Sequence, residues 1–381
     1  MRILFCGKSG YPSSNNAAIN RYSSIAKVMS YENDIIFINR IPLLENNCVY
    51  NKTEFKVIAA SYHKYRPKNF LKRNFIKLFS PMFEFGTIWS LNKEKKIDWV
   101  NVYTDYFGLC LFYFILSKIF RFKTILHFVE IRSEFKNQNL FLKINHFLYD
   151  NFSMFLFDRY LPISRFLDEH LKNKNSNIKA LIIPPICDFD YFKKINIPNE
   201  FNETYFLYCG STAYSEVIVF IIDSFEKVRQ EKSVNLYLVL NGIVPDELKV
   251  LLEQKRERIK VFSNLDYNKL IGLYKSALAL LIPLRDTEQD KARFPQKICE
   301  YIASEKIIIS TNYGEVKHYF EDMNNALIAD EYNEEIYAKK MEWVVHNISN
   351  LNELEGAAYK TGKKYFDIIS YKESINDLLK G

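Results

Sequence analysis

The chain of 381 residues carries 52 Lys and Arg against 45 Asp and Glu, a formal net charge of +7, and 48% of its residues are hydrophobic. With 11 Gly and 6 Cys, this composition excludes a collagen-like chain, a disordered chain and a disulfide scaffold. At roughly 100 to 200 residues per domain, the length predicts two folded domains, each with its own core.

The cysteines and the apolar runs indicate where the protein works. The two cysteines nearest in sequence, Cys187 and Cys209, lie 22 positions apart, which excludes a C-x-x-C metal site and favours a reducing cytoplasm. The N-terminal segment 1–7 is too short in apolar residues for a signal peptide. The longest apolar run, 106–120, is shorter than the ~20 residues that span a bilayer, so we expect a buried or interfacial helix there.

In chain order, short β-branched and aromatic runs alternate with longer helical patterns, which predicts parallel sheets covered by helices. A polar, aperiodic stretch, 190–203, separates two such series and is the predicted interdomain linker. Residues 352–381 look helical and have no strand to cover, so we expect them to cross back onto the first domain. The predicted strands are 2–6, 34–39, 55–60, 99–103, 124–128, 159–163 and 180–183, then 205–208, 235–240, 259–262, 278–282, 307–310 and 326–328.

Ligands of open α/β sheets bind beyond the carboxyl ends of the strands, so candidate site residues are sought in the loops there. The loop 7–21 contains Gly7 and Gly10 but no phosphate-binding glycine motif. A P-loop would need glycine at position 2, which is Arg2, and a dinucleotide fingerprint would need a third glycine. Two interpretations stay open: backbone N–H groups that bind phosphate or sugar hydroxyls, and a plain strand–helix turn.

One histidine and one glutamate stand at the end of the predicted strand 124–128. His127 and Glu130 occupy positions from which a side chain can contact a ligand. A His in the middle of the strand would instead be a packing residue. We favour the ligand role for His127, and a packing or surface role for the other histidines.

The segment 285–310 has the richest set of polar side chains beyond a predicted strand. A helix is expected to begin near Pro295, and Lys297 and Glu300 are three residues apart, so they share one face of it. Arg293 stands just ahead of this helix. Because cations bind phosphate oxygens and a carboxylate accepts from vicinal hydroxyls, the set suits a diphosphate and a ribose. The alternative is an ordinary solvated helix start.

Five segments carry a resemblance to one family. Residues 293–315, Arg-Phe-Pro-Gln-Lys-Ile-Cys-Glu-Tyr-Ile-Ala-Ser-Glu-Lys-Ile-Ile-Ile-Ser-Thr-Asn-Tyr-Gly-Glu, are similar to its pattern FPxKxxEYxAxGKPVIxTxxGE. Residues 160–167 are similar to xxxxISxxL, 182–188 to IPNxxD, 265–270 to LxYxEL and 324–327 to GxNALL. In this order and placement, the segments make the chain similar to family-4 retaining glycosyltransferases of the GT-B fold.

The resemblance implies an α/β protein with two Rossmann-like domains facing across a cleft. The expected parts are an acceptor-binding domain (1–192), a nucleotide-sugar-binding domain (203–360) and a C-terminal helix (361–381) that packs back on the first. It implies a hexosyltransferase-type enzyme that moves a sugar, with retention, from a UDP- or GDP-sugar to a glycan or polyprenyl-diphosphate-linked acceptor in surface polysaccharide biosynthesis. Neither a cofactor nor a metal is expected.

The resemblance also assigns roles to residues. Glu300 would take the nucleotide ribose and Lys297 or Arg293 the diphosphate, while His127 and Glu130 would be the catalytic pair near the transferred sugar. A diphosphate oxygen would assist deprotonation of the acceptor on the front face. The remaining residues are implied for the donor, Gly210, Ser211, Phe262 and Leu265, and for the acceptor and phosphate loop, Gly7, Gly10, Asn16 and Arg21.

The sequence departs from the family pattern at the first of two paired glutamates. The position eight residues before Glu300 is Ala292, and Glu288 and Asp290 lie nearby but out of register. This departure puts the contacts to the donor sugar in question.

Two further departures concern phosphate neutralisation and helix packing. The loop 210–216 lacks the Arg and Lys phosphate ligands of the family, and Glu305 stands where the family has glycine. We expect Arg293 and Lys297 to supply the missing positive charge.

Residues 63–79 interleave six cations with aromatic and aliphatic side chains. Such a stretch either lies on an anionic leaflet or forms a solvated helix face. The first interpretation would place the protein peripherally at the inner face of the membrane, where a polyprenyl-linked acceptor would lie. Nucleic acid is not an expected partner, because +7 over 381 residues is modest and no reading module is present.

Two other function classes stay open. A catalytically inactive GT-B module would bind a nucleotide sugar or a partner enzyme without turnover, as Ala292 and the absence of Arg and Lys from the 210–216 loop suggest. A nucleotide-sugar epimerase of the same fold is the other. The retained set of Glu300, Lys297 and His127 argues for an active transferase.

Overall fold

The structure is a computed structural model that describes residues 1–7, 10–12, 17–40, 54–61, 67–133, 138–197, 203–228 and 234–381. The chain forms two compact units. The first unit comprises residues 1–184 and 371–381, and the second unit comprises residues 185–370. The chain therefore leaves the first unit at Pro184, ahead of the predicted linker 190–203, whose first residues form the short helix α6 (Phe189–Lys194).

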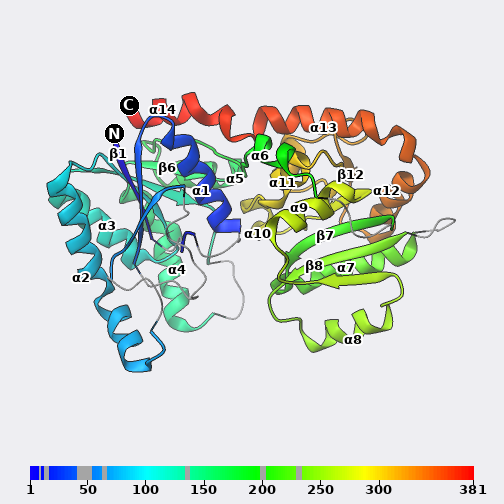
Figure 1. Ribbon diagram of the computed structural model, residues 1–381, viewed down its shortest axis with the longest axis horizontal. Helices are drawn as coiled ribbons and strands as arrows, with labels where there is room; N and C mark the ends of the chain where they lie inside the picture. The colour runs from blue at the N-terminus through cyan, green and yellow to red at the C-terminus, as the bar shows by residue number, and fades with distance from the viewer. Residues whose placement is uncertain are drawn as a thin grey trace. The chain divides into compact units, whose positions relative to one another are not determined.

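The first unit is built on a parallel sheet of six strands among its described residues, in the order β3-β2-β1-β4-β5-β6 (Figure 1). The order reverses between β1 and β4, which makes their carboxyl ends the switch point where ligands of such sheets bind. The strands are β1 (Arg2–Gly7), β2 (Asp34–Asn39), β3 (Lys56–Ala59), β4 (Trp99–Tyr103), β5 (Lys123–Phe128) and β6 (Arg159–Pro162).

The second unit repeats this topology, with six described parallel strands in the order β12-β11-β10-β7-β8-β9. Its switch point lies between β7 and β10. The strands are β7 (Tyr205–Ser211), β8 (Asn235–Asn241), β9 (Ile259–Phe262), β10 (Ala279–Ile282), β11 (Ile308–Thr311) and β12 (Leu327–Ala329). The predicted α/β class with two Rossmann-like sheets is confirmed.

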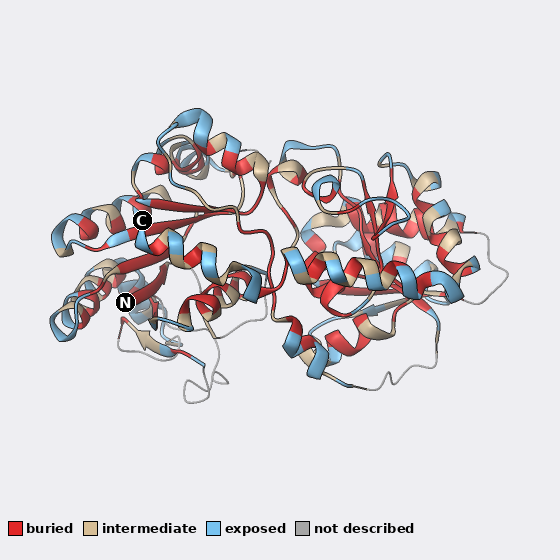
Figure 2. Cartoon of the chain, turned by 90° about the horizontal axis from the view of Figure 1, so that it is seen from above, coloured by how far each residue is buried: buried red, intermediate tan, exposed pale blue. Residues whose placement is uncertain are grey.

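The strands form because runs of apolar residues can be buried on both faces of a parallel sheet. In β1, for example, Ile3, Leu4 and Phe5 are fully buried. Figure 2 shows most strands of both sheets as buried and the covering helices as buried on one side only. The predicted strand 180–183 is not formed: Ala180 makes one isolated bridge to Tyr160, and although the Ile183 N–H donates to the Pro162 carbonyl at 3.0 Å, Pro162 has no N–H with which to continue the ladder.

Helices cover both sheets. In the first unit α2, α3 and α4 form one contiguous layer, while α1 packs with the C-terminal helix α14. The predicted helix over 106–120 is confirmed as α3, and no helix in the described ranges is long and apolar enough to cross a membrane. The first-unit helices are α1 (Ala17–Ser30), α2 (Phe70–Glu94), α3 (Phe107–Phe120), α4 (Leu140–Phe152), α5 (Arg165–Lys174) and α14 (Lys372–Lys380). Those of the second unit are α6, α7 (Ser215–Lys227), α8 (Asp246–Gln254), α9 (Tyr267–Ser276), α10 (Glu288–Ala292), α11 (Lys297–Ala303), α12 (Glu334–His346) and α13 (Leu351–Tyr365).

The C-terminal segment divides between the two units. Helix α13 stays with the second unit, and the chain joins the first unit again at Tyr371. Helix α14 then packs against α1, and Lys372 at its start lies 3.5 Å from Glu32. The predicted continuous helix over 352–381 is thus interrupted, since a 3-10 turn, Ile368–Tyr371, separates α13 from α14.

Candidate functional site

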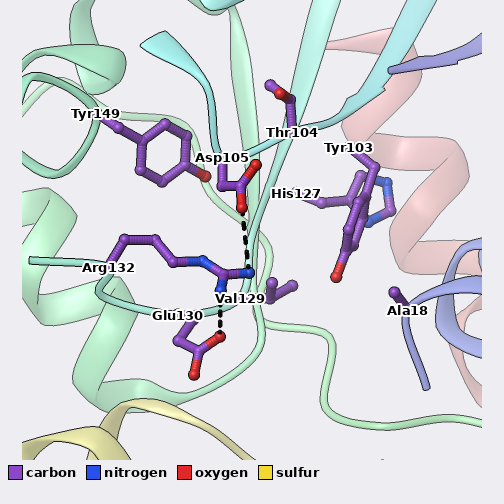
Figure 3. A pocket seen from close by; sticks show the side chains of 9 residues that line it. All are labelled: Ala18, Tyr103, Thr104, Asp105, His127, Val129, Glu130, Arg132 and Tyr149. Atoms are coloured by element: carbon purple, nitrogen blue, oxygen red, sulfur yellow. Dashed lines mark ion pairs between the residues drawn. The ribbon is translucent and has the colours of Figure 1, made fainter. Parts of the chain in front are cut away.

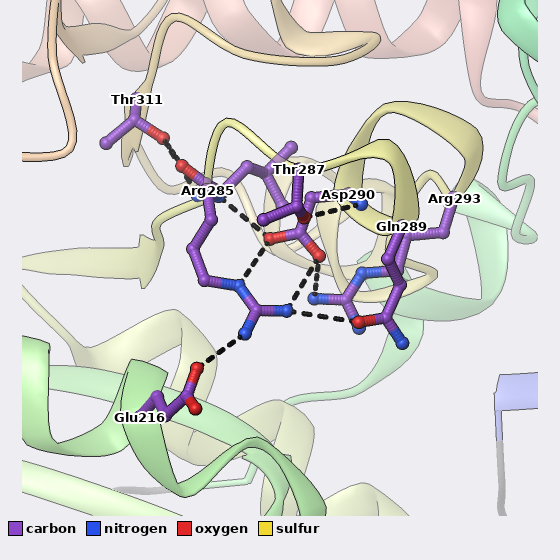
Figure 4. A network of polar contacts seen from close by, with 8 residues as sticks. Glu216, Arg285, Thr287, Gln289, Asp290, Arg293 and Thr311 are labelled. Atoms are coloured by element: carbon purple, nitrogen blue, oxygen red, sulfur yellow. Dashed lines mark hydrogen bonds and ion pairs between the residues drawn. The ribbon is translucent and has the colours of Figure 1, made fainter. Parts of the chain in front are cut away.

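The loops that follow β7, β10 and β11 meet at the carboxyl edge of the second sheet (Figure 4). Their centre is Asp290 on α10, a carboxylate with no solvent exposure. Helix α10 begins directly after Thr287, because the Thr287 side chain caps it by accepting from the Asp290 N–H at 3.2 Å. The bend after β11 is equally tight: Gly314 has φ +59°, and a Cβ on it would lie 2.7 Å from the Asp290 carbonyl oxygen.

Two arginines hold the Asp290 carboxylate. Arg285 donates to it from its backbone N–H (2.8 Å), Nε (3.0 Å) and Nη2 (3.2 Å). Arg293 approaches from the other side, with Nη2 at 2.7 Å. These bonds raise the pKa of Arg285, chiefly through its hydrogen bond with Asp290, which outweighs its desolvation. Two cations therefore share one buried anion.

The remaining contacts of the arginines lead to the loop after β7. The Arg285 Nη1 lies 3.0 Å from Glu216, whose side chain is 80% exposed, and the Arg293 guanidinium stacks 4.1 Å from the ring centre of Tyr214. Both partners belong to the 210–216 loop that lacks cations of its own. The structure thus brings two arginines that follow β10 against the loop that follows β7.

Helix α11 carries the second cation–carboxylate set. Lys297 Nζ donates to Glu300 Oε2 at 3.1 Å, as the three-residue spacing predicts, and Tyr267 at the start of α9 donates to Glu300 Oε1 at 3.3 Å. Glu300 is fully buried, whereas Lys297 is half-buried. Burial would lower the pKa of Lys297, but Cys209 and Glu300 raise it above its usual value, so the side chain is a cation.

The helix itself is shorter than the sequence suggests. It begins at Lys297, with Gln296 ahead of it, and spans seven residues. The field of so short a helix is weak, so the charge at this site comes from side chains rather than from a helix terminus.

The other predicted donor residues lie at the same edge of the sheet. Gly210 is the last residue but one of β7, and a Cβ on it would lie 2.2 Å from the Tyr208 hydroxyl. Ser211 accepts from the Ala213 N–H at 3.2 Å. Phe262 and Leu265, at the end of β9 and in the loop after it, are half-buried and lead into Tyr267, which contacts Glu300.

The first unit holds a cavity of about 190 Å³ at its own switch point (Figure 3). The residues that line it come from α1, from the ends of β4 and β5 and from α4. They are Ala18, Tyr103, Thr104, Asp105, His127, Val129, Glu130, Arg132 and Tyr149.

His127 is a neutral acceptor at the wall of this cavity. Its Nε2 lies 2.6 Å from Oδ1 of Asn101, an atom that only accepts, so Nε2 carries the proton and Nδ1 keeps a free lone pair. The side chain is buried, and Nδ1 has no hydrogen-bond partner among the described residues. Burial, with a smaller effect of the Arg21 cation, holds the pKa of His127 well below its usual value.

Glu130 belongs to an ion-paired triad on the opposite side of the cavity. Arg132 lies between two carboxylates, with Nη1 3.2 Å from Glu130 and Nη2 3.7 Å from Asp105. Burial would lower the pKa of Arg132, but Glu130 and Asp105 raise it. The backbone N–H of Arg132 donates to buried Asp150, which fixes the turn after β5. Two acids around one cation give the triad a formal charge of −1.

The predicted phosphate loop is described only in part. Gly7 has φ +107°, and a Cβ on it would lie 2.3 Å from the Tyr103 carbonyl oxygen, so only glycine lets β1 and β4 end side by side. Gly10 also has positive φ, at +61°. Arg21 on α1 is buried, and its Nη1 donates to the Pro184 carbonyl at 2.9 Å. Asn16 lies outside the described residues.

The predicted residues therefore form two groups. Lys297, Glu300 and Arg293 gather with the β7 loop in the second unit, and His127 and Glu130 line one cavity in the first. Sequence reasoning missed the side chains that hold these groups in place. Those are Arg285 and Asp290 in the second unit, and Asp105, Arg132 and Tyr149 in the first. In the sequence, the mixed charges of 285–293 were the only indication of the Arg285–Asp290 contact.

No cluster of three or more metal-ligating side chains occurs in the part of the chain that the structure describes. The triplet Asp188-Phe189-Asp190 has the D-x-D spacing, but its acids have other contacts. Asp188 caps α6 by accepting from the Tyr191 N–H at 3.0 Å, and Asp190 pairs with Lys363 at 3.2 Å.

Comparison with known proteins identifies the architecture. Residues 190–361, most of the second unit, match the family model of glycosyl transferases group 1. Sucrose-phosphate synthase from Thermosynechococcus elongatus is similar over 100% of this chain and 98% of its own, with 12% identity and a TM-score of 0.75. The chain has the GT-B fold. A structure of Anabaena HepE in complex with UDP and glucose is similar over 100% and 99% of the two chains (14% identity, TM-score 0.73).

A third similar structure is a glycosyltransferase from Rickettsia africae, with 16% identity, a TM-score of 0.69 and coverage of 100% of this chain and 97% of that one. No curated protein matches the sequence. The family match and the structural neighbours together indicate a glycosyltransferase enzyme.

Proposed function

We propose that the chain is a family-4 retaining glycosyltransferase that moves a sugar from a UDP- or GDP-sugar to a glycan or polyprenyl-diphosphate-linked acceptor in surface polysaccharide biosynthesis. The second unit binds the donor and the first unit binds the acceptor. The reaction needs no metal, because arginine and lysine side chains neutralise the leaving group. The HepE structure with UDP and glucose, on the same fold, supports a nucleotide-sugar donor.

The observation that carries the proposal is the cluster of three cations, Arg285, Arg293 and Lys297, at the switch point of the second sheet. Arg285 and Arg293 share the buried carboxylate of Asp290, and among the described residues the only other acid that pairs with Arg285 is the exposed Glu216. A diphosphate can displace an exposed carboxylate at small cost, since such pairs contribute only ~0–1 kcal/mol. Asp290 then keeps both guanidinium groups oriented.

Lys297 and Glu300 divide the nucleotide between them. Glu300 is buried and already accepts from Tyr267 and Lys297, so it is fixed in place to accept from ribose hydroxyls. The Lys297 ammonium has three donors and uses one of them on Glu300, which leaves others for phosphate oxygens.

The chemistry follows from this arrangement of charge. The bond between the anomeric carbon and the diphosphate oxygen breaks, and negative charge develops on the diphosphate. Cations already in place stabilise that charge without reorganisation, an effect of ~3 kcal/mol for each group. A diphosphate oxygen accepts the proton of the acceptor hydroxyl, whose oxygen bonds to the same face of the anomeric carbon, so configuration is retained.

In the first unit, the cavity at the switch point takes part of the substrate. The His127 Nδ1 lone pair can accept a hydrogen bond from a sugar hydroxyl, and the Glu130–Arg132–Asp105 triad offers both acceptors and a donor. We assign His127 and Glu130 the role of orienting the transferred sugar and the acceptor hydroxyl. The protein would lie peripherally at the inner face of the membrane, with 63–79 toward the lipid.

Titration calorimetry with UDP and GDP tests the donor site. Arg293→Ala and Lys297→Ala should each weaken binding of the preferred nucleotide roughly 10- to 100-fold, the value of a charge-assisted hydrogen bond. Lys291→Ala is the matched control, because the ion pairs of Lys291 in the described part of the chain are with two exposed acids, Asp286 and Glu288. Unchanged affinity in both Arg293→Ala and Lys297→Ala would overturn the proposal.

Activity assays separate this function from its rivals. An active transferase should hydrolyse its nucleotide sugar slowly when no acceptor is present. A catalytically inactive module would bind the nucleotide and release nothing. An epimerase would isomerise the sugar without releasing the nucleoside diphosphate.

A further inference from the structure

Three neighbouring helices of the first unit each carry an apolar stripe on the side that faces solvent. Helices α2, α3 and α4 cover one face of the sheet, and α3 contacts both of the others. A helix that packs on a sheet needs one apolar stripe, toward the core. A second stripe on the outer side therefore needs a separate explanation.

Helix α2 shows the two stripes most clearly. Its inner side is buried through Ile76, Ser80, Glu84, Thr87, Ile88 and Leu91. Its outer side has large apolar side chains at i, i+4, i+7, i+11 and i+18. These are Leu71, Phe75, Leu78, Met82 and Trp89, exposed by 76%, 54%, 75%, 68% and 48%.

Helices α3 and α4 continue the pattern. On α3 the outer stripe is Leu111, Ile115 and Ile119, spaced by four residues and 38% to 56% exposed. On α4 it is Leu140, Phe141, Ile144, Phe147 and Phe152, exposed by 44% to 74%. Because the three helices lie side by side, their stripes form one surface, here called the α2–α3–α4 face (Figure 1).

The rest of the described surface lacks such a concentration. Among the described residues of the second unit, only seven large hydrophobic ones are exposed, and they are scattered over separate elements: Tyr191, Ile243, Val250, Val261, Met323, Ile348 and Ile369. Single exposed apolar residues are ordinary, whereas a contiguous apolar surface marks an interaction site.

Charge on the α2–α3–α4 face is mostly positive. The three helices carry six cations, Lys72, Arg73, Lys77, Lys93, Lys118 and Lys143. Their acidic residues are Glu84 and Asp150, both buried, and Glu94 at the end of α2. Some cations lie against the apolar side chains: Lys93 sits 4.8 Å from the Trp89 ring centre and Lys118 the same distance from that of Phe114.

We infer that the α2–α3–α4 face binds the surface of an anionic phospholipid bilayer. Apolar side chains enter the acyl boundary while long basic side chains reach the phosphate headgroups, the arrangement of an interfacial helix repeated three times. The inference extends the lipid contact beyond 63–79, part of which lies outside the described residues. It rests on the proposed function only for the reason why the protein would bind a membrane, which is access to a lipid-linked acceptor.

A bilayer fits this face better than a second copy of the chain. Two copies would bring six cations against six, with only Glu94 to offset them. Association of like-charged surfaces is unfavourable, whereas an anionic leaflet attracts every one of these cations.

Vesicle flotation of the full-length chain tests the inference, with vesicles of phosphatidylcholine alone and of phosphatidylcholine with phosphatidylglycerol. The wild type should float with the anionic vesicles at low salt and be partly released at high salt. Leu78→Ser, Ile115→Ser and Phe141→Ser change one exposed residue on each helix, so the fold should remain intact. Each should lower the vesicle partition coefficient roughly tenfold.

Ile243→Ser is the matched control, because Ile243 is 90% exposed but lies in the second unit. It should float like the wild type. A wild type that stays in solution with anionic vesicles would overturn the inference, as would equal losses in Ile243→Ser and Leu78→Ser. If the wild type does not bind lipid but forms dimers, and the three variants do not form dimers, the face is a protein interface instead.

The flotation assay uses no nucleotide, and the three variants should keep wild-type UDP affinity. Failure of lipid binding with intact UDP binding would therefore refute the surface alone. A wild type that binds neither UDP nor GDP would refute the proposed function alone.

Discussion

Asp290→Asn should destabilise the second unit, because the carboxylate is the only anion buried between Arg285 and Arg293. Its oxygens accept three hydrogen bonds from Arg285, at 2.8, 3.0 and 3.2 Å, and pair with Arg293 at 2.7 Å. An amide keeps the shape but carries no charge and turns an NH₂ group toward donors. Two guanidinium groups would then repel each other with nothing between them.

The size of the effect follows from the burial of the three side chains. Breaking a fully buried ion pair from one side costs ~3–5 kcal/mol. Asp290 has no exposure but each arginine side chain is 17% exposed, so the lower end, about 3 kcal/mol, applies. For a domain of this size each kcal/mol lowers Tm by ~2–4 °C, which gives a decrease of roughly 6–12 °C.

Thermal unfolding followed by circular dichroism measures this shift. Glu288→Gln is the control two residues away on α10, where an exposed pair with Lys291 is worth at most ~1 kcal/mol. Its Tm should fall by no more than about 4 °C. Equal Tm values for Asp290→Asn and Glu288→Gln would refute the idea that Asp290 holds the two arginines.

Two further predictions concern the first unit. Gly7→Ala places a Cβ 2.3 Å from the Tyr103 carbonyl oxygen at φ +107° and should lower the free energy of unfolding by about 1–3 kcal/mol in urea titrations. Gly86→Ala is the control, because a Cβ there meets nothing within 4 Å, and it should not lower this free energy. Equal losses in the two variants would contradict the close approach of β1 and β4 at Gly7. Burial lowers the pKa of His127, so below pH ~6.5 the imidazole takes up a proton in the unfolded chain but not in the folded chain. The free energy of unfolding therefore decreases as the pH is lowered, by up to ~1.4 kcal/mol per pH unit. In His127→Gln this loss between pH 6.5 and 5 should be smaller, and parallel pH profiles of wild type and variant would count against a neutral, buried imidazole.

Local sequence patterns were sufficient for most strands. The predicted strands 34–39 and 99–103 match β2 and β4 residue for residue, because β-branched and aromatic runs of that length have few other ways to be buried. Residues 180–183 are as apolar as a strand, but they form no ladder because their partner Pro162 has no N–H to donate, and this partner is known only from the structure.

Part of the candidate site could also be predicted from local sequence patterns, and part could not. The Lys297–Glu300 pair follows from helical spacing alone. Asp105 and Arg132 are 27 positions apart and meet only because β4 and β5 are neighbours with aligned carboxyl ends. Asp290 was noted in the sequence, but its role depends on how the loop after β10 turns Arg285 back onto α10, which no periodic pattern encodes.

A crystal structure of the chain with bound UDP tests the central claim most directly. The account predicts phosphate oxygens within hydrogen-bonding distance of Arg293 and Lys297, a ribose hydroxyl on Glu300, and the Glu216 carboxylate displaced from Arg285. Electron density for UDP away from the carboxyl edge of the second sheet, with the Arg285–Glu216 pair intact, would contradict it.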